Sequence, residues 1–131
     1  MPIRPRIIPS LLIHNKGLVK TVKFKEFKYI GDPINTVRIF NEKNVDEIVI
    51  FDIDATSLSL EPNFSLIQKL ANESRMPLCY GGGIKNIYQL EKIINLGVEK
   101  VSLSSSAIYN PKLIQTAASL VGSQSVVITL D

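Results

Sequence analysis

Five short runs of almost uninterrupted apolar residues recur along this chain, and they constrain its fold more than any other feature. The runs are "RIIPSLLI" (6–13), "EIVIFDI" (47–53), "PLCYG" (77–81), "KVSLS" (100–104) and "SVVITLD" (125–131). A strand with one exposed face alternates apolar and polar residues, whereas a strand buried on both faces of a parallel sheet does not. The five runs therefore predict the strands of a parallel sheet.

Helix signals lie between these apolar runs. A helix is expected from its cap at Asp32 to about Asn44, and another opens at Pro62. Two further apolar stripes of helical spacing end before Gly97 and Gly122. Strand and helix thus alternate as in a right-handed α/β repeat. The similar layouts of "NVDEIVIFD" and "GVEKVSLSS" indicate a duplicated unit.

Residues suited to chemistry follow the carboxyl ends of the predicted strands. Asp52 and Asp54 follow the second strand, three glycines (81–83) the third, three serines (104–106) the fourth, and Asp131 the fifth. Active sites of parallel α/β folds lie at this edge, so we expect the two aspartates on the substrate side. The glycines have two interpretations. They form either a tight turn or a bed of backbone N–H groups that binds an anion such as phosphate.

The composition excludes several classes of protein. The 131 residues suit one domain (1–131), and no apolar run approaches the roughly 20 residues that span a bilayer. Cys79 is the only cysteine, so we expect no internal disulfide and a reducing, cytoplasmic location. The net charge of +3 is mild. Basic residues gather between Lys20 and Lys28, where we expect a solvated loop. No aromatic–basic module accompanies them, so we expect no nucleic-acid partner.

Six motifs together carry a resemblance to a known family. "RIIPSLL", "GDPI", "VDEIVIFDIDA", "YGGGIKN", "GVEKVSLSSSAIYNPKLI" and "GSQSVVITLD" keep their order and spacing from residue 6 to residue 131. They resemble the N-terminal half of the HisF-type cyclase subunit of imidazole glycerol phosphate synthase. The resemblance implies an α/β fold that is half of a TIM (βα)8 barrel, (βα)4 plus a fifth strand. It also implies that a HisH-like glutaminase docks at the amino end of the full barrel and sends ammonia through it.

The resemblance assigns a phosphate site to one half of the barrel. Gly82, Gly83, Ser104 and Ser105 match the family's phosphate cradle, which implies a phosphorylated small molecule as ligand. Glycines allow close approach of the backbone, and hydroxyl groups donate hydrogen bonds to phosphate oxygens. The family usually has Asn-Thr where this chain has Ser104-Ser105. A purely structural turn remains the alternative.

The resemblance also locates the cyclase chemistry, and here the chain departs from the pattern. The family uses two aspartates as general acid and base, and Asp131 matches the second of them. Leu12 stands where the first is expected, and leucine can neither accept nor donate a proton. His14 points to the same strand face as Leu12 and is one candidate to substitute for the aspartate, although a lone histidine near a strand end is more often a surface residue. Lys20 matches a lysine of the family's first loop. We therefore expect an impaired cyclase.

A charged ring at the amino end is retained. Arg6, Glu47 and Lys100 match the family's ammonia gate, and all three stand at strand starts. Charges of alternating sign satisfy one another there. Ordinary salt bridges at the base of a barrel are the alternative interpretation. Glu99 and Gln124 match positions on the face that docks the glutaminase.

A lost catalytic aspartate beside a retained gate indicates a particular branch. The chain resembles HisF-like proteins of surface-polysaccharide pathways, which imply a further partner, an N-acetyl sugar amidotransferase, and amidation of a nucleotide-linked sugar. One alternative is a histidine-pathway cyclase with an altered first strand, and another is a non-catalytic half-barrel module. No metal and no cofactor are implied.

The strand count predicts self-association. Closure of this kind of barrel needs eight strands, so the first and fifth predicted strands would each have an open edge. The inner face, which we expect to carry Leu12, Ile50 or Phe51, Cys79 and Leu103, would also be open. Exposed apolar surface of this kind usually finds a partner. We expect a homodimer or higher oligomer.

Overall fold

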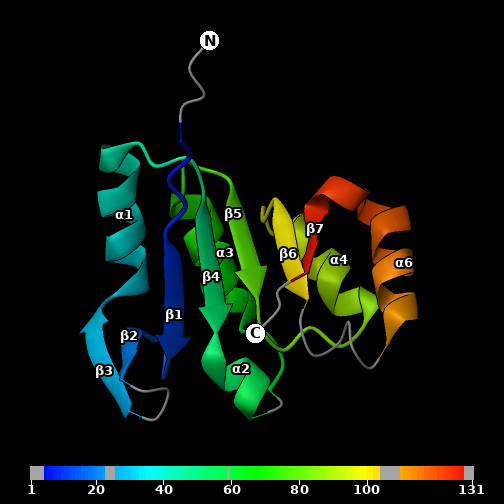
Figure 1. Cartoon of the computed structure of the whole chain (residues 1–131), viewed down its shortest axis with the longest axis horizontal. Helices are drawn as coiled ribbons and strands as arrows, with labels where there is room; N and C mark the ends of the chain where they lie inside the picture. Colours follow the sequence, from blue (N-terminus) through cyan, green and yellow to red (C-terminus); the bar gives the residue numbers. More distant parts are fainter. Residues whose placement is uncertain (1–4, 23–25, 59, 104–109, 129–131) are drawn as a thin grey trace.

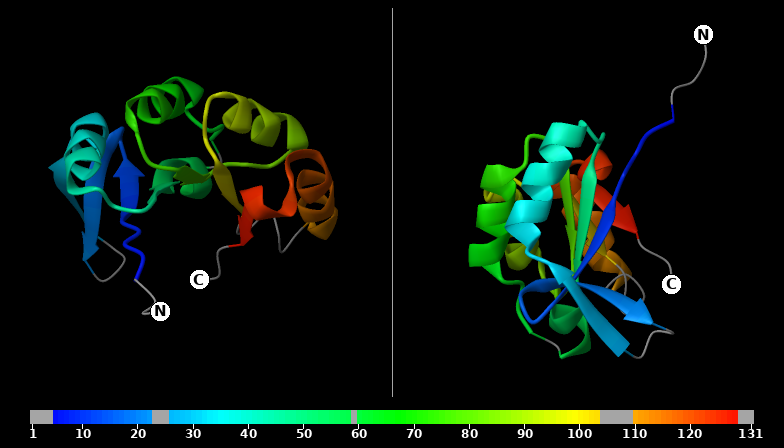
Figure 2. Two further views of the ribbon diagram at one scale, coloured as in Figure 1. Left: turned by 90° about the horizontal axis from the view of Figure 1, so that it is seen from above. Right: turned by 90° about the vertical axis from the view of Figure 1, so that its left-hand side faces the viewer.

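The chain folds as one curved sheet that is covered by helices on its convex side. The computed structural model describes residues 5–22, 26–58, 60–103 and 110–128. Seen from above, the strands line the inside of an arc and the larger helices lie outside it (Figure 2). This is the α/β half barrel that the sequence predicts.

The sheet has the strand order β3-β2-β1-β4-β5-β6-β7. Five strands run parallel, and they are β1 (Ser10–His14), β4 (Ile48–Asp52), β5 (Leu78–Gly81), β6 (Lys100–Leu103) and β7 (Val126–Ile128). The antiparallel strands β2 (Gly17–Val22) and β3 (Glu26–Gly31) extend one edge. Figure 1 shows the carboxyl ends of β1, β4 and β5 pointing the same way, toward the hairpin and α2.

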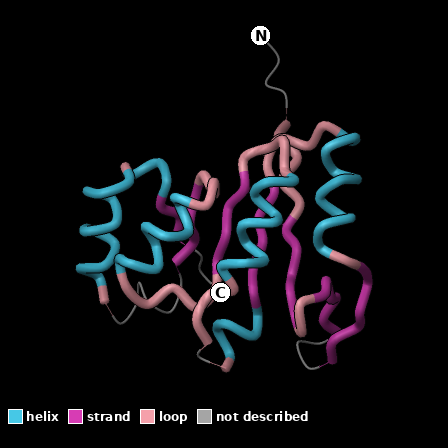
Figure 3. Tube along the Cα trace, turned by 180° about the vertical axis from the view of Figure 1, so that it is seen from behind, coloured by secondary structure: helices cyan, strands magenta, loops and turns pink. Residues whose placement is uncertain are grey.

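Four helices connect the parallel strands and cover the convex face, as the view from behind shows (Figure 3). They are α1 (Pro33–Lys43), α3 (Phe64–Glu73), α4 (Ile87–Asn95) and α6 (Pro111–Val121). A short helix α2 (Ile53–Ser57) follows β4, and a 3-10 turn η1 (Ser123–Ser125) precedes β7. The predicted unit of four strand–helix repeats plus a fifth strand is confirmed.

Helix boundaries follow their capping residues. The Asp32 carboxylate accepts a hydrogen bond from the Asn35 N–H at 2.9 Å, and the helix ends at Asn44 in the left-handed conformation, as expected. The helix expected to open at Pro62 begins two residues later. Asn63 is its cap, because the Asn63 side-chain oxygen accepts from the Leu66 N–H at 3.1 Å.

The main core lies between the sheet and the helices. Alternate strand residues, among them Ile48, Ile50, Tyr80, Val101 and Leu103, pack there against helix residues that include Val37, Ile67, Leu70, Leu90, Ile93 and Ala117. Most of these side chains are fully buried. This core explains why the strand sequences do not alternate strictly: their other face is apolar in part as well.

The inner face carries two layers of side chains. The pairing register aligns Ser10, Val49, Cys79 and Lys100 in one layer, and Leu12, Phe51, Gly81, Ser102 and Val127 in the next. The expectation that Leu103 faces inward is therefore wrong, and Phe51 rather than Ile50 is the inward residue of β4. Strand side chains alternate, so Lys100 and Ser102 point inward while Leu103 joins the helix-side core.

The basic segment between Lys20 and Lys28 is not a solvated loop. Its described residues belong to the β2–β3 hairpin, where Lys20 pairs with Lys28. Antiparallel strands with one solvated face tolerate regularly spaced lysines, which explains the misleading composition. The first strand is also shorter than expected. Pro9 lacks an N–H and cannot donate to the ladder, although its carbonyl accepts from Val49 at 2.9 Å.

Candidate functional site

A histidine–aspartate pair joins the carboxyl ends of two neighbouring strands. His14 is the last residue of β1, and Asp54 lies in the first turn of α2, directly after β4. The Nδ1 atom of His14 lies 2.6 Å from Oδ1 of Asp54. Both side chains are mostly shielded, with exposed fractions of 27% and 17%. The pair is therefore close, and solvent still reaches it.

The second oxygen of Asp54 fixes the β1–β2 turn. Oδ2 accepts a hydrogen bond from the Asn15 N–H at 2.7 Å. Asn15 and Lys16 both have positive φ, 51° and 64°, as in the two-residue turns that best match the twist of a hairpin. The Asn15 side-chain Nδ2 also lies 3.2 Å from Nε2 of His14. Asp54 thus binds two consecutive residues of the neighbouring strand end.

Asp52 and Asp54 differ in their electrostatic surroundings. Burial raises the pKa of the Asp52 carboxyl, and the nearby charge of Asp54 acts in the same direction, against a hydrogen bond from the Ala55 N–H at 3.1 Å. Burial also acts to raise the pKa of Asp54. The hydrogen bonds from Asn15 and His14 outweigh it and leave that pKa lowered. Asp54 is therefore the more firmly ionised of the two.

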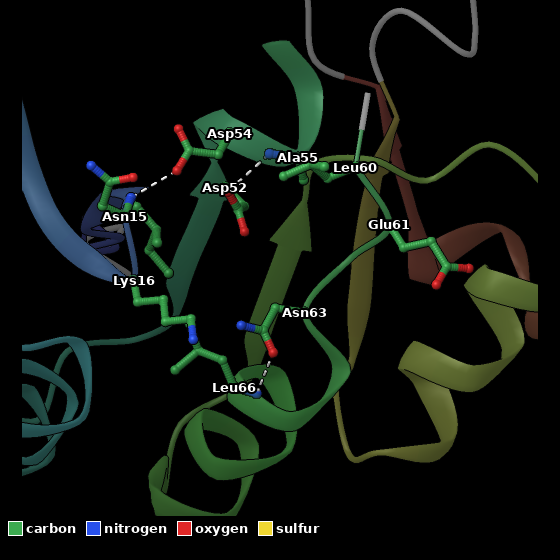
Figure 4. A pocket seen from close by; sticks show the side chains of 10 residues that line it. Asn15, Lys16, Asp52, Asp54, Ala55, Leu60, Glu61, Asn63 and Leu66 are labelled. Atoms are coloured by element: carbon green, nitrogen blue, oxygen red, sulfur yellow. Dashed lines mark hydrogen bonds between the residues drawn. The ribbon is translucent and has the colours of Figure 1, made fainter. Parts of the chain in front are cut away.

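A cavity of about 210 Å³ lies beside these carboxylates. Its lining combines polar and apolar groups, namely Ile13, Asn15, Lys16, Asp52, Asp54, Ala55, Leu60, Glu61, Asn63 and Leu66. Figure 4 shows Asn15 and Lys16 on one side of the cavity, with Asn63 and Leu66 from the start of α3 on the other. Among the described residues, no cluster of three or more histidine, cysteine, aspartate or glutamate side chains could hold a metal ion.

The glycine turn after β5 packs tightly on backbone at both ends of α2, before and after the helix. A Cβ atom on Gly82 would lie 2.7 Å from the Asp52 carbonyl oxygen, and one on Gly83 would lie 2.5 Å from the Leu60 carbonyl oxygen. Both glycines also have positive φ. The buried Tyr80 hydroxyl donates to the Gly82 carbonyl at 2.9 Å. Internal packing alone therefore requires glycine here, whether or not the turn also binds phosphate.

Several predicted site residues fall at or near this edge. Leu12 lies in β1 on the same face as His14 and pairs with Phe51, and Lys20 lies in β2 with an exposed side chain. Ser104, Ser105 and Asp131 lie outside the described residues. Their predicted roles in phosphate binding and catalysis remain predictions.

At the opposite end of the sheet, Glu47 lies between two cations. Its Oε1 atom is 3.2 Å from Nζ of Lys100, and its Oε2 atom is 3.6 Å from a guanidinium nitrogen of Arg6. The Glu47 side chain is only 6% exposed, whereas those of Lys100 and Arg6 are 27% and 58% exposed. The three residues expected to form the charged ring do lie together. Their role as a gate is not tested by this proximity.

A second cavity, of about 260 Å³, extends from this cluster along the inner face. It is lined by Ile8, Ser10, Glu47, Val49, Phe51, Cys79, Lys100, Ser102 and Val127. Burial raises the pKa of the Cys79 thiol to about 11, and the Glu47 carboxylate acts in the same direction. Cys79 is therefore a neutral thiol at physiological pH. The lining is uncharged beyond the Glu47–Lys100 pair.

The predicted docking residues lie near the amino end as well. Glu99 immediately precedes β6 and is exposed, and its N–H donates to the Leu78 carbonyl at 3.0 Å. Gln124 lies in the η1 turn and is also exposed. Both side chains are available to a partner, and neither is required by the core.

Sequence reasoning missed the contact between His14 and Asp54. It weighed His14 as a substitute for the lost aspartate against the more common surface residue, and it treated Asp54 as a separate substrate-side carboxylate. The available signal was their position: each polar residue follows an apolar run, and the two runs form adjacent parallel strands. The strand order, which the sequence does not state directly, is what brings the two together.

The curved parallel sheet, with polar residues at its carboxyl edge, defines an α/β protein of the half-barrel type. Residues 6–131 match the family described as histidine biosynthesis protein, and the chain belongs to this family.

Three relatives show the range of similarity. The chain is 60% identical to the candidate imidazole glycerol phosphate synthase subunit hisF3 of Vibrio vulnificus and 57% identical to the candidate subunit hisF2 of Pseudomonas aeruginosa. It is 43% identical to the imidazole glycerol phosphate synthase subunit HisF of Clostridium botulinum. Each match covers 98% of this chain and 50% or 51% of the relative. The chain is thus HisF-like and spans about half the length of the curated relatives it matches.

None of the helices in the described part of the chain combines the length and the apolar character needed to cross a bilayer.

Proposed function

We propose that this chain is part of a HisF-like synthase subunit that accepts ammonia from a HisH-like glutaminase and relays it along the inner face of the barrel. The ammonia would serve to amidate a nucleotide-linked sugar, with an N-acetyl sugar amidotransferase as further partner. The observation that carries this proposal is Leu12. An apolar side chain stands where the cyclase resemblance requires a proton-transferring carboxylate.

The amino end supports the relay. Glu47 is nearly fully buried yet makes contacts with both Lys100 and Arg6, so the charges compensate one another at the point where ammonia would enter. A buried carboxylate without such partners would be strongly unfavourable. Apart from the Glu47–Lys100 pair, the lining of the adjoining cavity is uncharged and includes Ser10 and Cys79, which suits a small uncharged molecule such as ammonia.

The sequence identities also support the HisF-like branch over the histidine-pathway cyclase. Identity to the hisF3 and hisF2 relatives is 60% and 57%, whereas identity to the HisF subunit of Clostridium botulinum is 43%. Each of the three matches spans 129 residues, so the difference does not arise from the length of the match.

A cyclase assay tests the loss of the histidine-pathway reaction. The polypeptide that contains this chain is supplied with the cyclase substrate and excess ammonium, and formation of imidazole glycerol phosphate is measured. We expect no turnover, because loss of an acid–base partner commonly costs about 10²- to 10⁴-fold. The same assay is run on Leu12→Asp, which restores the carboxylate, and on Leu12→Asn, its matched control, which adds polarity without a titratable proton. Turnover similar to that of an intact cyclase would contradict the proposal.

The alternative function, a histidine-pathway cyclase, has one specific observation in its favour. The family match covers residues 6–131, and the Clostridium botulinum relative is named as an imidazole glycerol phosphate synthase subunit. Restoration of cyclase activity by Leu12→Asp but not by Leu12→Asn would favour this alternative.

We also propose that a phosphate group binds at the glycine turn, held by Gly82, Gly83, Ser104 and Ser105. The positive φ values of the two glycines and their position at the carboxyl edge support this site. Titration with inorganic phosphate, followed by amide NMR shifts, should perturb these four positions first. Shifts confined to the segment between Lys20 and Lys28 would contradict it.

The open inner face supports self-association of the 131-residue chain. The expectation of an open edge at the first strand is wrong, because β2 pairs with β1 on the side away from β4. At the other end, the three-residue strand β7 is the last strand of the described sheet. We propose a homodimer or higher oligomer in which a second copy completes the barrel. Light scattering across a dilution series tests it, and a stable monomer at micromolar concentration would contradict it.

A further inference from the structure

The contact between His14 and Asp54 is not needed to hold the hairpin turn in place. The turn is already held by the hydrogen bond from the Asn15 N–H to Oδ2 of Asp54, at 2.7 Å. The second carboxylate oxygen is directed at the imidazole instead, at 2.6 Å from Nδ1. A short contact between a carboxylate and one ring nitrogen fixes the orientation of a histidine and its tautomer.

The geometry assigns different tasks to the two ring nitrogens. With Asp54 ionised, Nδ1 carries the hydrogen and donates it to Oδ1, which leaves Nε2 as an acceptor. Nε2 lies 3.2 Å from Nδ2 of Asn15, a weak contact at the exposed surface. Asn15 belongs to a two-residue turn, so a donor group of a ligand can take the place of its amide. Nε2 is therefore the nitrogen that a ligand would meet.

The position of the pair suits a reaction at the carboxyl edge. His14 shares the inner face of β1 with Leu12 and Ser10, and Ser10 lines the inner cavity that begins at Glu47. Two residues along a strand span about 7 Å. Molecules that move along the inner face from the amino end would reach His14 just beyond Leu12.

We propose that His14 and Asp54 form a proton-transfer pair, in which Nε2 of His14 accepts a proton from ammonia as it adds to an electrophilic carbon of an acceptor. His14 is the catalytic residue and Asp54 the positioning residue. The proposal rests on the proposed relay in one respect, namely that ammonia reaches this edge. It goes beyond the relay in placing an amination step here.

The step balances without an oxidant or a metal. The nitrogen lone pair of ammonia forms a bond to the carbon of a C=O or C=N group in the acceptor, and the π electrons of that group move to its heteroatom. The new C–N bond leaves a positive charge on nitrogen. One N–H bond then breaks, its electrons stay on nitrogen, and its proton passes to Nε2, which returns it to the acceptor heteroatom. In the amidation of an N-acetyl group this oxygen takes up a second proton from the added nitrogen and leaves as water, and the nitrogen lone pair forms the new C=N bond. The Asp54 carboxylate stabilises the imidazolium that results.

The first test needs no acceptor. His14 is the only histidine of the chain, so every imidazole signal and every modified imidazole belongs to it. Imidazole ¹⁵N NMR reports its tautomer, and modification by diethyl pyrocarbonate reports the reactivity of Nε2. We expect the tautomer with the hydrogen on Nδ1, and modification at least about tenfold slower in Asp54→Asn, since the carboxylate no longer holds that tautomer. Asp32→Asn is the matched control, because asparagine caps α1 equally well. A hydrogen on Nε2, or equal reactivity of the two variants, overturns the proposal.

The second test separates this proposal from the relay. The subunit that contains this chain is assayed for ammonium-dependent amidation of UDP-N-acetylglucosamine together with the partner amidotransferase, without glutaminase. We expect His14→Gln to lower the rate at saturating ammonium by about 10²-fold or more, and His14→Ala to be partly rescued by added imidazole. If the wild type forms product and His14→Gln is equally active, the proton-transfer pair is overturned and the proposed relay is not. No product from the wild type overturns the proposed function and this step together.

Discussion

Replacement of Gly83 by alanine tests whether the glycine turn is required by packing. Gly83 has φ +73°, where an L-residue costs about 1–2 kcal/mol. The added Cβ would lie 2.5 Å from the Leu60 carbonyl oxygen and 2.9 Å from the Ala55 Cβ. Because the nearest atom is backbone, the α2–α3 connection around Leu60 must shift, and overpacking of this kind costs about 1–3 kcal/mol. Alanine also restricts the unfolded chain, which returns about 0.5 kcal/mol. We therefore expect Gly83→Ala to lower the free energy of unfolding by about 2–4 kcal/mol.

Gly31→Ala is the matched control for this experiment. A Cβ at Gly31 would meet only Thr36 Oγ1, at 3.7 Å, and Gly31 does not have a positive φ. We expect it to change stability by less than about 1 kcal/mol in either direction. Urea denaturation followed by circular dichroism measures both variants. A Gly83→Ala variant within about 1 kcal/mol of the wild type would refute the packing argument and leave phosphate binding as the reason for glycine.

Three further predictions concern the two ends of the sheet. Lys16→Gly should raise stability by about 0.5–1 kcal/mol in thermal or urea unfolding, because Lys16 holds φ 64° in a turn that favours glycine; a loss would contradict the turn assignment. Double-mutant cycles should give a coupling of about 1–2 kcal/mol for Glu47 with Lys100 and less than about 0.5 kcal/mol with the more exposed Arg6; the reverse order would contradict the geometry. Because the folded pKa of Asp54 is lowered, its stabilisation is present above the unfolded pKa of about 3.9 and is lost as pH falls through the folded value. Stability of the wild type should therefore fall more steeply below about pH 4 than that of Asp54→Asn, and parallel curves would count against the contact.

Much of the architecture follows from local signals in the sequence. The strands β4 and β5 are nearly continuous in apolar residues, and the α1 helix has its cap at Asp32 and ends at Asn44. These features depend on residues close together in the chain, so sequence patterns predict them well. The charged cluster of Arg6, Glu47 and Lys100 was predicted through the family resemblance, and the three side chains do lie together.

The parts that sequence reasoning missed depend on pairing between distant segments. The lysines between residues 20 and 28 indicate solvent exposure, but a hairpin strand with one solvated face has the same composition as a loop. The direction of Leu103 depends on the register of β6 against β5, which a shift of one residue would reverse. The contact of His14 with Asp54 requires β1 and β4 to be neighbours, although 40 positions separate the two residues. No local pattern contains that information.

The proposed relay is tested most directly by tracing nitrogen from glutamine. Glutamine labelled with ¹⁵N in its side-chain amide is supplied to the subunit containing this chain, its glutaminase and the amidotransferase, and the acceptor sugar is analysed by mass spectrometry. The account predicts ¹⁵N in the amidated sugar, with Glu47→Gln lowering incorporation from glutamine while leaving incorporation from free ammonium unchanged. Incorporation of the label into imidazole glycerol phosphate instead, or an equal loss from both nitrogen sources in Glu47→Gln, would contradict it.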